Sequence, residues 1–277
     1  MAESFNDIRV FRIAQTQVNS EAVADWLKDL GADEFLNEYQ NGAHDEVSDP
    51  AFLVALAAKQ CYMAFQPSLN PNLTKVRKDM VEYLDNVLRQ AHGSVLEHAV
   101  FTYAINGCSR VFTGEMNRHR AGVGISERSM RYVRYENISY WMPECFRPTD
   151  ADTSDMYAKK ASSRALLLRQ FSQQEAAMAE FASIWADELK GNDFHTKKVL
   201  TSAFRRVIGM GIATGGVWTL NARALRHVLA LRTAEGAEEE IVHVCMKIGR
   251  DMIEAYPELF GDFEEVGGSL KPMYWKV

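Results

Sequence analysis

The architecture of this chain is most constrained by the segment Val100-Phe101-Thr102-Tyr103-Ala104-Ile105-Asn106-Gly107. It is rich in β-branched and aromatic residues, which predicts a strand that ends at the Asn106-Gly107 dipeptide. Ser109 then predicts the N-cap of a helix that runs from Arg110 to about His119. Two glycines within residues 120–124 predict a loop after that helix. A strand that passes directly into a helix is consistent with an α/β protein.

Hydrophobic periodicity extends this pattern in both directions. Apolar and charged residues alternate over residues 8–13, which predicts a strand. Helices are predicted at residues 20–39, 49–62, 73–90, 156–190, 196–208, 218–231 and 238–256. The stretch 156–190 is long enough to comprise two helices. Nothing marks a domain boundary, so we expect a single domain over residues 1–277, in which residues 1–48 form an N-terminal extension.

Composition excludes several classes of protein. The 277 residues include 31 basic and 37 acidic side chains, a formal charge of -6. Bulk attraction to nucleic acid or to an anionic membrane is therefore not expected. No apolar run reaches the roughly 18 residues that span a membrane. Four cysteines are scattered without a C-x-x-C pair, which favours reduced thiols and a cytoplasmic protein.

The segment from Arg110 to Arg134 has the most unusual composition. It holds six arginines, two acidic residues and no lysine. Arginine without lysine favours bidentate binding of phosphate or carboxylate. The intervening glycines and serines would let backbone N–H groups approach an anion. The alternative is a solvated loop whose arginines pair with acidic residues elsewhere, because a charge cluster alone is a weak signal.

Two further groups of polar residues stand out. His92, Glu97 and His98 lie within seven residues, but their spacing is not the i, i+4 of a helical zinc site, so we expect a polar loop and no metal. Arg223 and His227 would stack on one helix face near Asn221-Ala222, with Arg232 near its end. On their own, these three side chains are either outward solubilising groups, which is favoured, or inward ligands.

Together the pieces resemble the flavin-dependent thymidylate synthases. Arg118-His119-Arg120 followed by Ser129-Met130-Arg131-Tyr132 is similar to that family's Arg-His-Arg and serine signature. Leu96-Glu97-His98, Gly107-Cys108-Ser109-Arg110, Asn221-Ala222-Arg223 and Leu231-Arg232 resemble the family in order and spacing. The resemblance covers roughly Phe52 to Phe260.

The chain departs from the family pattern at three places. Eight residues instead of seven separate Arg120 from Ser129. The region Gly209-Met210-Gly211 replaces a proline that usually follows the arginine matching Arg205. Gly236 and Glu238 stand where a histidine and a glutamine often follow the arginine matching Arg232. These departures concern the flavin and folate contacts and the outcome of the reaction.

The resemblance implies an α/β fold with helices around a central, mainly antiparallel sheet, and a homotetramer whose active sites use several chains. It implies methylation of dUMP to dTMP, with methylenetetrahydrofolate as carbon donor, FAD as hydride carrier and NADPH as reductant. FAD would supply the redox chemistry, while cationic side chains would polarise the pyrimidine.

The resemblance also assigns roles to residues. Arg232 would be catalytic, aimed at the uracil. The nucleotide would be bound by Glu115, Glu127, Ser129, Arg131, Arg205 and Arg232. The flavin would be held by Cys61, His92, Ser94, Arg118, His119, Arg120, Asn221, Arg223 and His227. For Cys61, a buried small hydrophobe is an equal alternative.

Three other functions are compatible with parts of the sequence. The departures suggest a relative that hydroxymethylates dUMP or dCMP, in which water and not hydride ends the reaction. The arginine segment alone suggests a nucleic-acid-binding protein, although the net charge opposes it. A flavin-free structural relative would bind neither ligand.

Overall fold

A four-stranded antiparallel sheet forms the centre of the protein in a computed structural model that describes residues 7–42, 44–73, 75–130, 139–191 and 193–277. Its strand order is β1-β2-β4-β3. The strands are β1 (Arg9–Gln15), β2 (Val100–Ser109), β3 (Val123–Glu127) and β4 (Ala213–Asn221), and a separate hairpin comprises β5 (Phe263–Val266) and β6 (Ser269–Pro272). The predicted α/β class with a mainly antiparallel sheet is confirmed.

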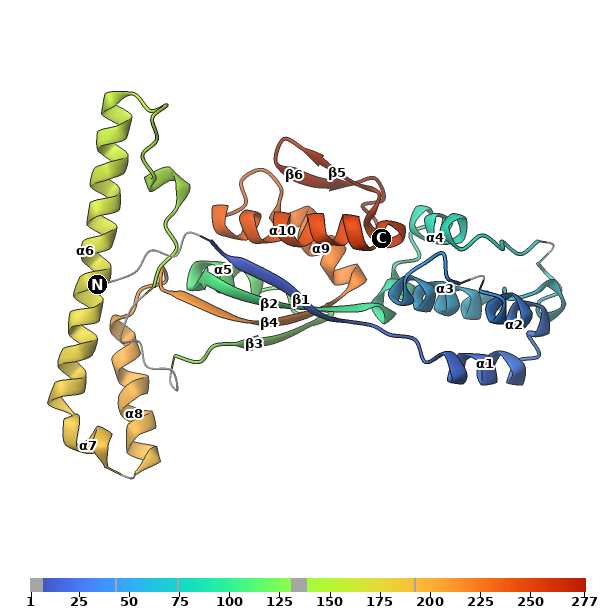
Figure 1. The fold of residues 1–277 in the computed structure, drawn as a ribbon, viewed down its shortest axis with the longest axis horizontal. Helices are drawn as coiled ribbons and strands as arrows, with labels where there is room; N and C mark the ends of the chain where they lie inside the picture. The colour runs from blue at the N-terminus through green and yellow to red at the C-terminus, as the bar shows by residue number, and fades with distance from the viewer. Residues whose placement is uncertain (1–6, 43, 74, 131–138, 192) are drawn as a thin grey trace.

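Helices surround this sheet in three groups (Figure 1). Over one face lie α5 (Arg110–Met116), α9 (Ala222–Arg232), α10 (Glu239–Ala255) and α11 (Pro257–Phe260). One end consists of α1 (Ser20–Asp29), α2 (Asp33–Gln40), α3 (Asp49–Tyr62) and α4 (Met80–Arg89). At the other end, α6 (Ser154–Ile184), α7 (Ala186–Lys190) and α8 (Phe194–Phe204) form an arm that stands across the long axis.

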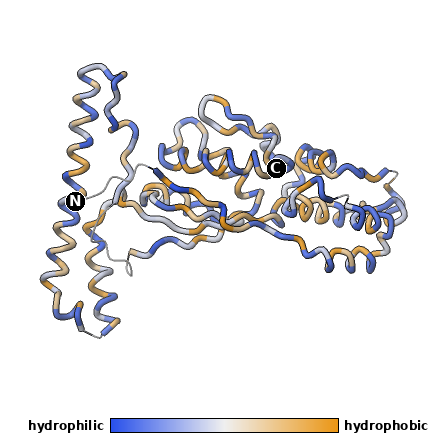
Figure 2. Tube along the Cα trace, viewed as in Figure 1, coloured by the Kyte–Doolittle hydropathy of each residue, from blue (hydrophilic) through white to orange (hydrophobic). Residues whose placement is uncertain are grey.

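Alternation along β2 explains the layering. Phe101, Tyr103 and Ile105 are fully buried and face the helices, whereas Thr102 and Ala104 on the opposite face are half-buried. The layers are joined at Asp251 of α10, which accepts hydrogen bonds from Arg12 at 2.9 Å and Tyr103 at 2.7 Å. In Figure 2 hydrophobic and hydrophilic colours alternate along the strands of the sheet, and α6 also mixes both colours along its length.

Several predicted elements are confirmed. The helix predicted at 49–62 is α3, with Pro50 in its first turn. The helical stretch 156–190 is divided into α6 and α7 at Trp185. The strand at 8–13 is β1, so part of the N-terminal extension is an edge strand of the central sheet. Among the described residues, helices long and apolar enough to cross a membrane are absent.

Other predictions were wrong in their boundaries. The loop predicted over 120–124 ends early, because β3 begins at Val123 and pairs with β4. Residues 218–221 were assigned to a helix but belong to β4, since Trp218 pairs with Tyr103 in the sheet. The helix predicted over 20–39 is interrupted between α1 and α2, the helix predicted from 73 begins at Met80, and the helix predicted to end near 119 ends at Met116.

The start of α5 is fixed by a buried carboxylate. Glu240 of α10, 1% exposed, accepts hydrogen bonds from both the backbone N–H and the hydroxyl of Ser109, the N-cap residue of α5. Burial raises the pKa of Glu240 to about 7, although both bonds from Ser109 act in the opposite direction. Glu240 therefore holds in place the helix that leads into Arg118-His119-Arg120.

We expect Glu240 to make stability depend on pH. The folded state keeps a proton on this carboxyl up to about pH 7, while the unfolded state loses it near pH 4.5. The free energy of unfolding should therefore decrease as the pH rises from about 4.5 to about 7, by about 3 kcal/mol from this group. Urea unfolding of Glu240→Gln from pH 5 to pH 8 should show a flatter profile than the wild type.

The exposed Glu264→Gln of β5 is the matched control, and its profile should follow the wild type. Parallel profiles for Glu240→Gln and the wild type would contradict the assignment.

Candidate functional site

A cleft of about 510 Å³ lies where the end of α5, the start of β3 and the first turns of α9 meet. This volume is within the range of small-molecule sites, about 300–1,000 Å³. We call it the arginine cleft; its lining comprises Glu97, Arg118, His119, Arg120, Ala121, Gly122, Asn221, Arg223, Ala224, His227, Val228 and Val277. Six of the nine predicted flavin-binding residues therefore share one cavity, from two segments far apart in the sequence.

Local structure explains why these segments meet. Asn221 ends β4 and caps α9, since its side chain accepts a hydrogen bond from the Ala224 N–H at 2.8 Å. Its own N–H donates to the Gly122 carbonyl at 3.0 Å. A Cβ at Gly122 would lie 2.4 Å from the side-chain amide nitrogen (Nδ2) of Asn221, and Gly122 has a φ of +67°. Glycine is therefore required for β3 to begin this close to α9.

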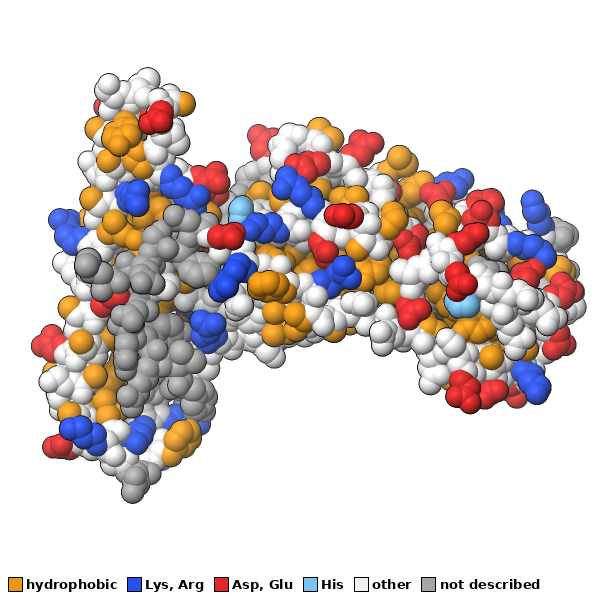
Figure 3. Space-filling model, viewed as in Figure 1, with side chains coloured by type: hydrophobic (Ala, Val, Ile, Leu, Met, Phe, Trp, Pro, Cys, Tyr) orange, Lys and Arg blue, Asp and Glu red, His pale blue; other side chains and the backbone are white. Residues whose placement is uncertain are grey.

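The charge of the cleft is positive. Three arginines line it, against one acidic side chain, that of Glu97, among its lining residues. That carboxylate accepts a hydrogen bond from Arg223 at 2.7 Å, and both side chains are about half exposed. Figure 3 shows acidic side chains spread over the α1–α4 end, the central layer and the arm. The cleft is thus suited to an anionic ligand in an otherwise acidic protein.

Beside the cleft, Arg232 is held by two neighbours. Its Nη1 lies 2.8 Å from the Glu115 carboxylate, and its Nη2 donates to the Glu115 carbonyl at 3.2 Å. Its Nε donates to His119 Nε2 at 2.8 Å. Glu115 also pairs with Arg118 at 3.1 Å. The predicted catalytic arginine and two predicted flavin ligands therefore form one hydrogen-bonded network.

The bond from Arg232 requires a neutral His119, because Nε2 must accept it. Burial lowers the pKa of His119, and the positive charge of Arg232 and the nearby His227 act in the same direction. The two imidazole rings lie 6.0 Å apart in an edge-to-face arrangement. His119 is thus a hydrogen-bonding group and not a third cation near the network.

Glu127 belongs to a different network on another side of α5. Its carboxylate lies 2.8 Å from Arg110 and accepts hydrogen bonds from Thr113 at 3.0 Å and Asn117 at 3.1 Å. Asn117 in turn accepts from the indole N–H of Trp218 at 3.1 Å. These contacts match the alternative that some arginines of the segment pair with acids, and they tie α5 to β3 and β4.

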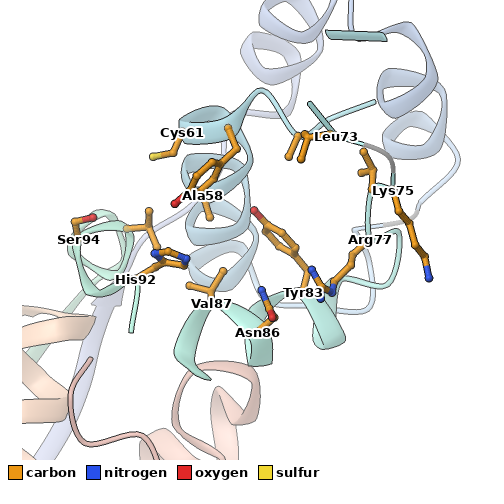
Figure 4. Close-up of a pocket in the computed structure, with 14 residues that line it drawn as sticks. Ala58, Cys61, Leu73, Lys75, Arg77, Tyr83, Asn86, Val87, His92 and Ser94 are labelled. Atoms are coloured by element: carbon orange, nitrogen blue, oxygen red, sulfur yellow. The ribbon is translucent and has the colours of Figure 1, made fainter. Parts of the chain in front are cut away.

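The remaining three predicted flavin residues, Cys61, His92 and Ser94, line a second cavity of about 220 Å³, which we call the α3–α4 pocket. Figure 4 shows them on one side of it, with Arg77 and Tyr83 on the other. In this chain the pocket is distinct from the arginine cleft, because the two cavities share no lining residue. The short helix η2 (Gly93–His98) lies along both, with Ser94 in the pocket and Glu97 in the cleft. Cys61 is exposed, so the buried alternative for it is wrong.

A buried lysine contacts two residues that line this pocket. Lys59 is fully enclosed, and its ammonium donates to the Arg77 carbonyl at 3.0 Å and lies 4.4 Å from the centroid of the Tyr83 ring. Burial lowers the pKa of Lys59 to about 8. The side chain fastens the segment that carries Arg77 to α3.

Two predicted nucleotide residues lie elsewhere in the chain. Ser129 follows the far end of β3, seven residues beyond Gly122. Arg205 is exposed in η4 (Arg205–Val207), which follows α8 at the arm. Arg131 lies outside the described residues. Neither Ser129 nor Arg205 lines the arginine cleft.

Six residues that line the arginine cleft were not among the predicted site residues, and two of these, Glu97 and Val277, come from outside the segments that carry the predicted ones. Glu97 belonged to a recognised motif, and its i, i+1 neighbour His98 drew attention to metal binding, but its ion pair with Arg223 spans 126 positions. Val277 carried no signal in the sequence. Of the departures, Glu238 has a structural explanation, because it caps α10 by accepting from the N–H groups of Glu240 and Ile241.

We expect the charge of Arg232 to keep His119 neutral. Arg232→Met removes the cation and the donor, so the pKa of His119 should rise toward its ordinary value. The side-chain NMR titration of His119 measures this shift directly. Arg223→Met, which removes a cleft arginine that does not bond to His119, is the matched control. An unchanged titration in Arg232→Met would contradict the network.

Comparison with known proteins agrees with the resemblance found in the sequence. The family described as Thymidylate synthase complementing protein matches residues 44–258. A curated relative from Mycobacteroides abscessus, named Flavin-dependent thymidylate synthase, is 31% identical over 216 residues, which cover 76% of this chain and 79% of the relative. A relative of the same name from Mycolicibacterium gilvum is 28% identical over 260 residues, covering 93% and 90%.

Solved structures share the fold. The UMP/dUMP methylase PolB from Streptomyces cacaoi, bound with 5-Br dUMP, has a TM-score of 0.60 and 17% identity, with 94% of this chain and 95% of that chain covered. Thymidylate Synthase X from Helicobacter pylori, with FAD and dUMP, has a TM-score of 0.52 and 17% identity, covering 92% and 98%. With the family match spanning most of its length, this chain belongs to the flavin-dependent thymidylate synthases, a family of methyltransferases.

Proposed function

We propose that this chain methylates dUMP to dTMP, with methylenetetrahydrofolate as carbon donor and with hydride that passes from NADPH through FAD. The observation that carries the proposal is the convergence of Arg118, His119, Arg120, Asn221, Arg223 and His227 on the arginine cleft beside Arg232. Membership of the family supports the reaction class, and the positive cleft supports a phosphorylated cofactor.

The residues of the arginine cleft fit FAD by their chemistry. Arg118, Arg120 and Arg223 supply planar bidentate donors that suit a pyrophosphate. The polar side chains of Asn221 and His227 supply further groups for a ribose or a ring. When bound, the flavin supplies the hydride chemistry, and the protein supplies placement and charge.

Arg232 would act on the pyrimidine. Carbon 5 of uracil is a weak nucleophile, and a cation beside the ring carbonyls would stabilise an anionic, enolate-like form of the pyrimidine from which carbon 5 attacks the carbon donor. Three of the five N–H groups of Arg232 have partners among the described residues, His119 and Glu115. The others are available to a carbonyl oxygen, in a side chain already oriented before substrate binds.

The division of the nucleotide residues favours a site shared between chains. From Gly122 to Ser129, seven extended residues span roughly 23 Å. Gly122 lines the arginine cleft, whereas Ser129 lies at the opposite end of this span and Arg205 lies on the arm. We therefore propose a homotetramer in which one chain supplies Arg232 and another supplies Ser129, Arg131 and Arg205.

Exposed apolar side chains support association of copies. Phe11 is 48% exposed on the side of the sheet that faces away from α10. On the arm, Leu166, Ile184 and Phe194 are at least half exposed. Large exposed apolar residues gathered on extended elements are typical of surfaces that pack against another chain.

Product identification is the direct test of the reaction. We expect purified protein with dUMP, labelled methylenetetrahydrofolate and NADPH to form labelled dTMP, and to form none when NADPH is omitted. Chromatography of the nucleotide products distinguishes the outcomes. Hydroxymethyl-dUMP as the sole product, with or without NADPH, would support the hydroxymethylase instead. Parallel reactions with UMP and dCMP define the nucleotide that is accepted.

Mixing of variants tests the shared site. Arg232→Ala should lower turnover by about 10²–10³, the usual cost of one preorganised charged donor. Arg205→Ala should also be poorly active because the nucleotide phosphate loses a partner. Hetero-oligomers formed by co-expression should regain activity, since some sites then hold both native arginines. If the mixture is no more active than the two variants, the two residues act within one chain.

A further inference from the structure

The last residues of the chain are fastened to the core beside the arginine cleft. The backbone of Tyr274 donates to Asp262 at 3.1 Å and accepts from Arg226 at 3.2 Å. Its hydroxyl donates to Asp85 of α4 at 2.8 Å. Arg226 and Asp262 are themselves a buried ion pair. Tyr274 therefore links α9, the β5–β6 hairpin and α4, and Figure 1 shows the C-terminus between these elements.

From this anchor, residues 275–277 extend to the cleft. Val277 lines the arginine cleft and also packs against the main hydrophobic core. Its carbonyl carbon would lie 2.8 Å from a Cβ placed on Gly93, and the Arg223 Nε would lie 2.9 Å from the same point. Gly93 has no positive φ, so its lack of a side chain matters for space. Val277 and Arg223 thus both approach the face of Gly93.

We propose that the segment Tyr274–Val277 is an additional part of the cofactor site, a fixed wall that closes the Gly93 end of the arginine cleft and confines Arg223 against a bound anionic dinucleotide. The inference rests on the proposed function of the cleft. The family match ends at residue 258, before this segment begins. The three hydrogen bonds of Tyr274 make the segment a wall and not a removable plug.

Charge at position 277 tests the wall directly. Val277→Glu adds a side-chain carboxylate near Arg223, beside the backbone carboxyl group of residue 277, and should weaken FAD binding about fivefold to tenfold at low salt, with a smaller effect at high salt. Val277→Lys adds a cation at the same place and should leave FAD binding unchanged or strengthen it. The measurement is the dissociation constant of FAD for the full chain, from quenching of flavin fluorescence, at two salt concentrations.

Trp275 gives the matched control in the same segment. It is 74% exposed and does not line the cleft, so Trp275→Glu and Trp275→Lys should bind FAD like the wild type. Gly93→Ala forces Val277 or Arg223 away and should also weaken FAD binding. The melting temperature of each FAD-free variant separates loss of a binding contact from loss of stability.

The outcomes distinguish the two proposals. If the wild type binds no FAD, both the proposed function and the wall are wrong. If the wild type binds FAD and the Glu and Lys variants at 277 bind alike, whether as tightly as wild type or equally weakly, the wall is wrong while the function stands. Opposite effects of the two charges at 277, absent at 275, support the wall.

Discussion

The buried ion pair between Arg226 and Asp262 is the constraint on which the cleft depends. Arg226 is 3% exposed, and its guanidinium donates to both Asp262 oxygens, at 2.6 and 2.8 Å, and to the Leu259 carbonyl at 2.6 Å. A buried charge is tolerated only when its hydrogen-bonding groups all have partners. Because Arg226 must reach Asp262 and Leu259, the rotation of α9 about its own axis is fixed. At about 100° per residue, Arg223 and His227 then share the neighbouring face, which opens to the cleft.

The same constraint shows how much the sequence could predict. The boundaries of α3 follow from local signals, an aspartate and a proline at its start. Trp218 and Leu220 gave no such signal, because a buried strand and a buried helix both appear as short apolar runs. Only the pairing of β4 with β2, more than 100 residues away, resolves that ambiguity. Contacts of this range are set by the whole fold and not by the local sequence.

For the site, ordered motifs identified the residue types but not their grouping. Arg118, Arg223 and His227 meet because α5, β3 and α9 converge. Cys61 and His92 lie in the α3–α4 pocket because η2 runs between the two cavities. The resemblance treats all of these as contacts of one flavin. Within one chain these residues lie in two separate cavities. The motifs alone therefore do not indicate where each part of a ligand would bind.

Carboxylates organise the arginines before any ligand is present. Glu115 pairs with Arg118 and Arg232, and Glu97 pairs with Arg223. Free lysines at these positions would be flexible point charges, whereas a guanidinium can bond to a carboxylate on one edge and keep other N–H groups for a ligand. This explains why the segment uses arginine alone. An orienting carboxylate reduces the net attraction for an anion, but it removes the cost of ordering the side chain when the anion binds. Pairing with carboxylates therefore gives the arginines a fixed orientation at the expense of a smaller net positive charge.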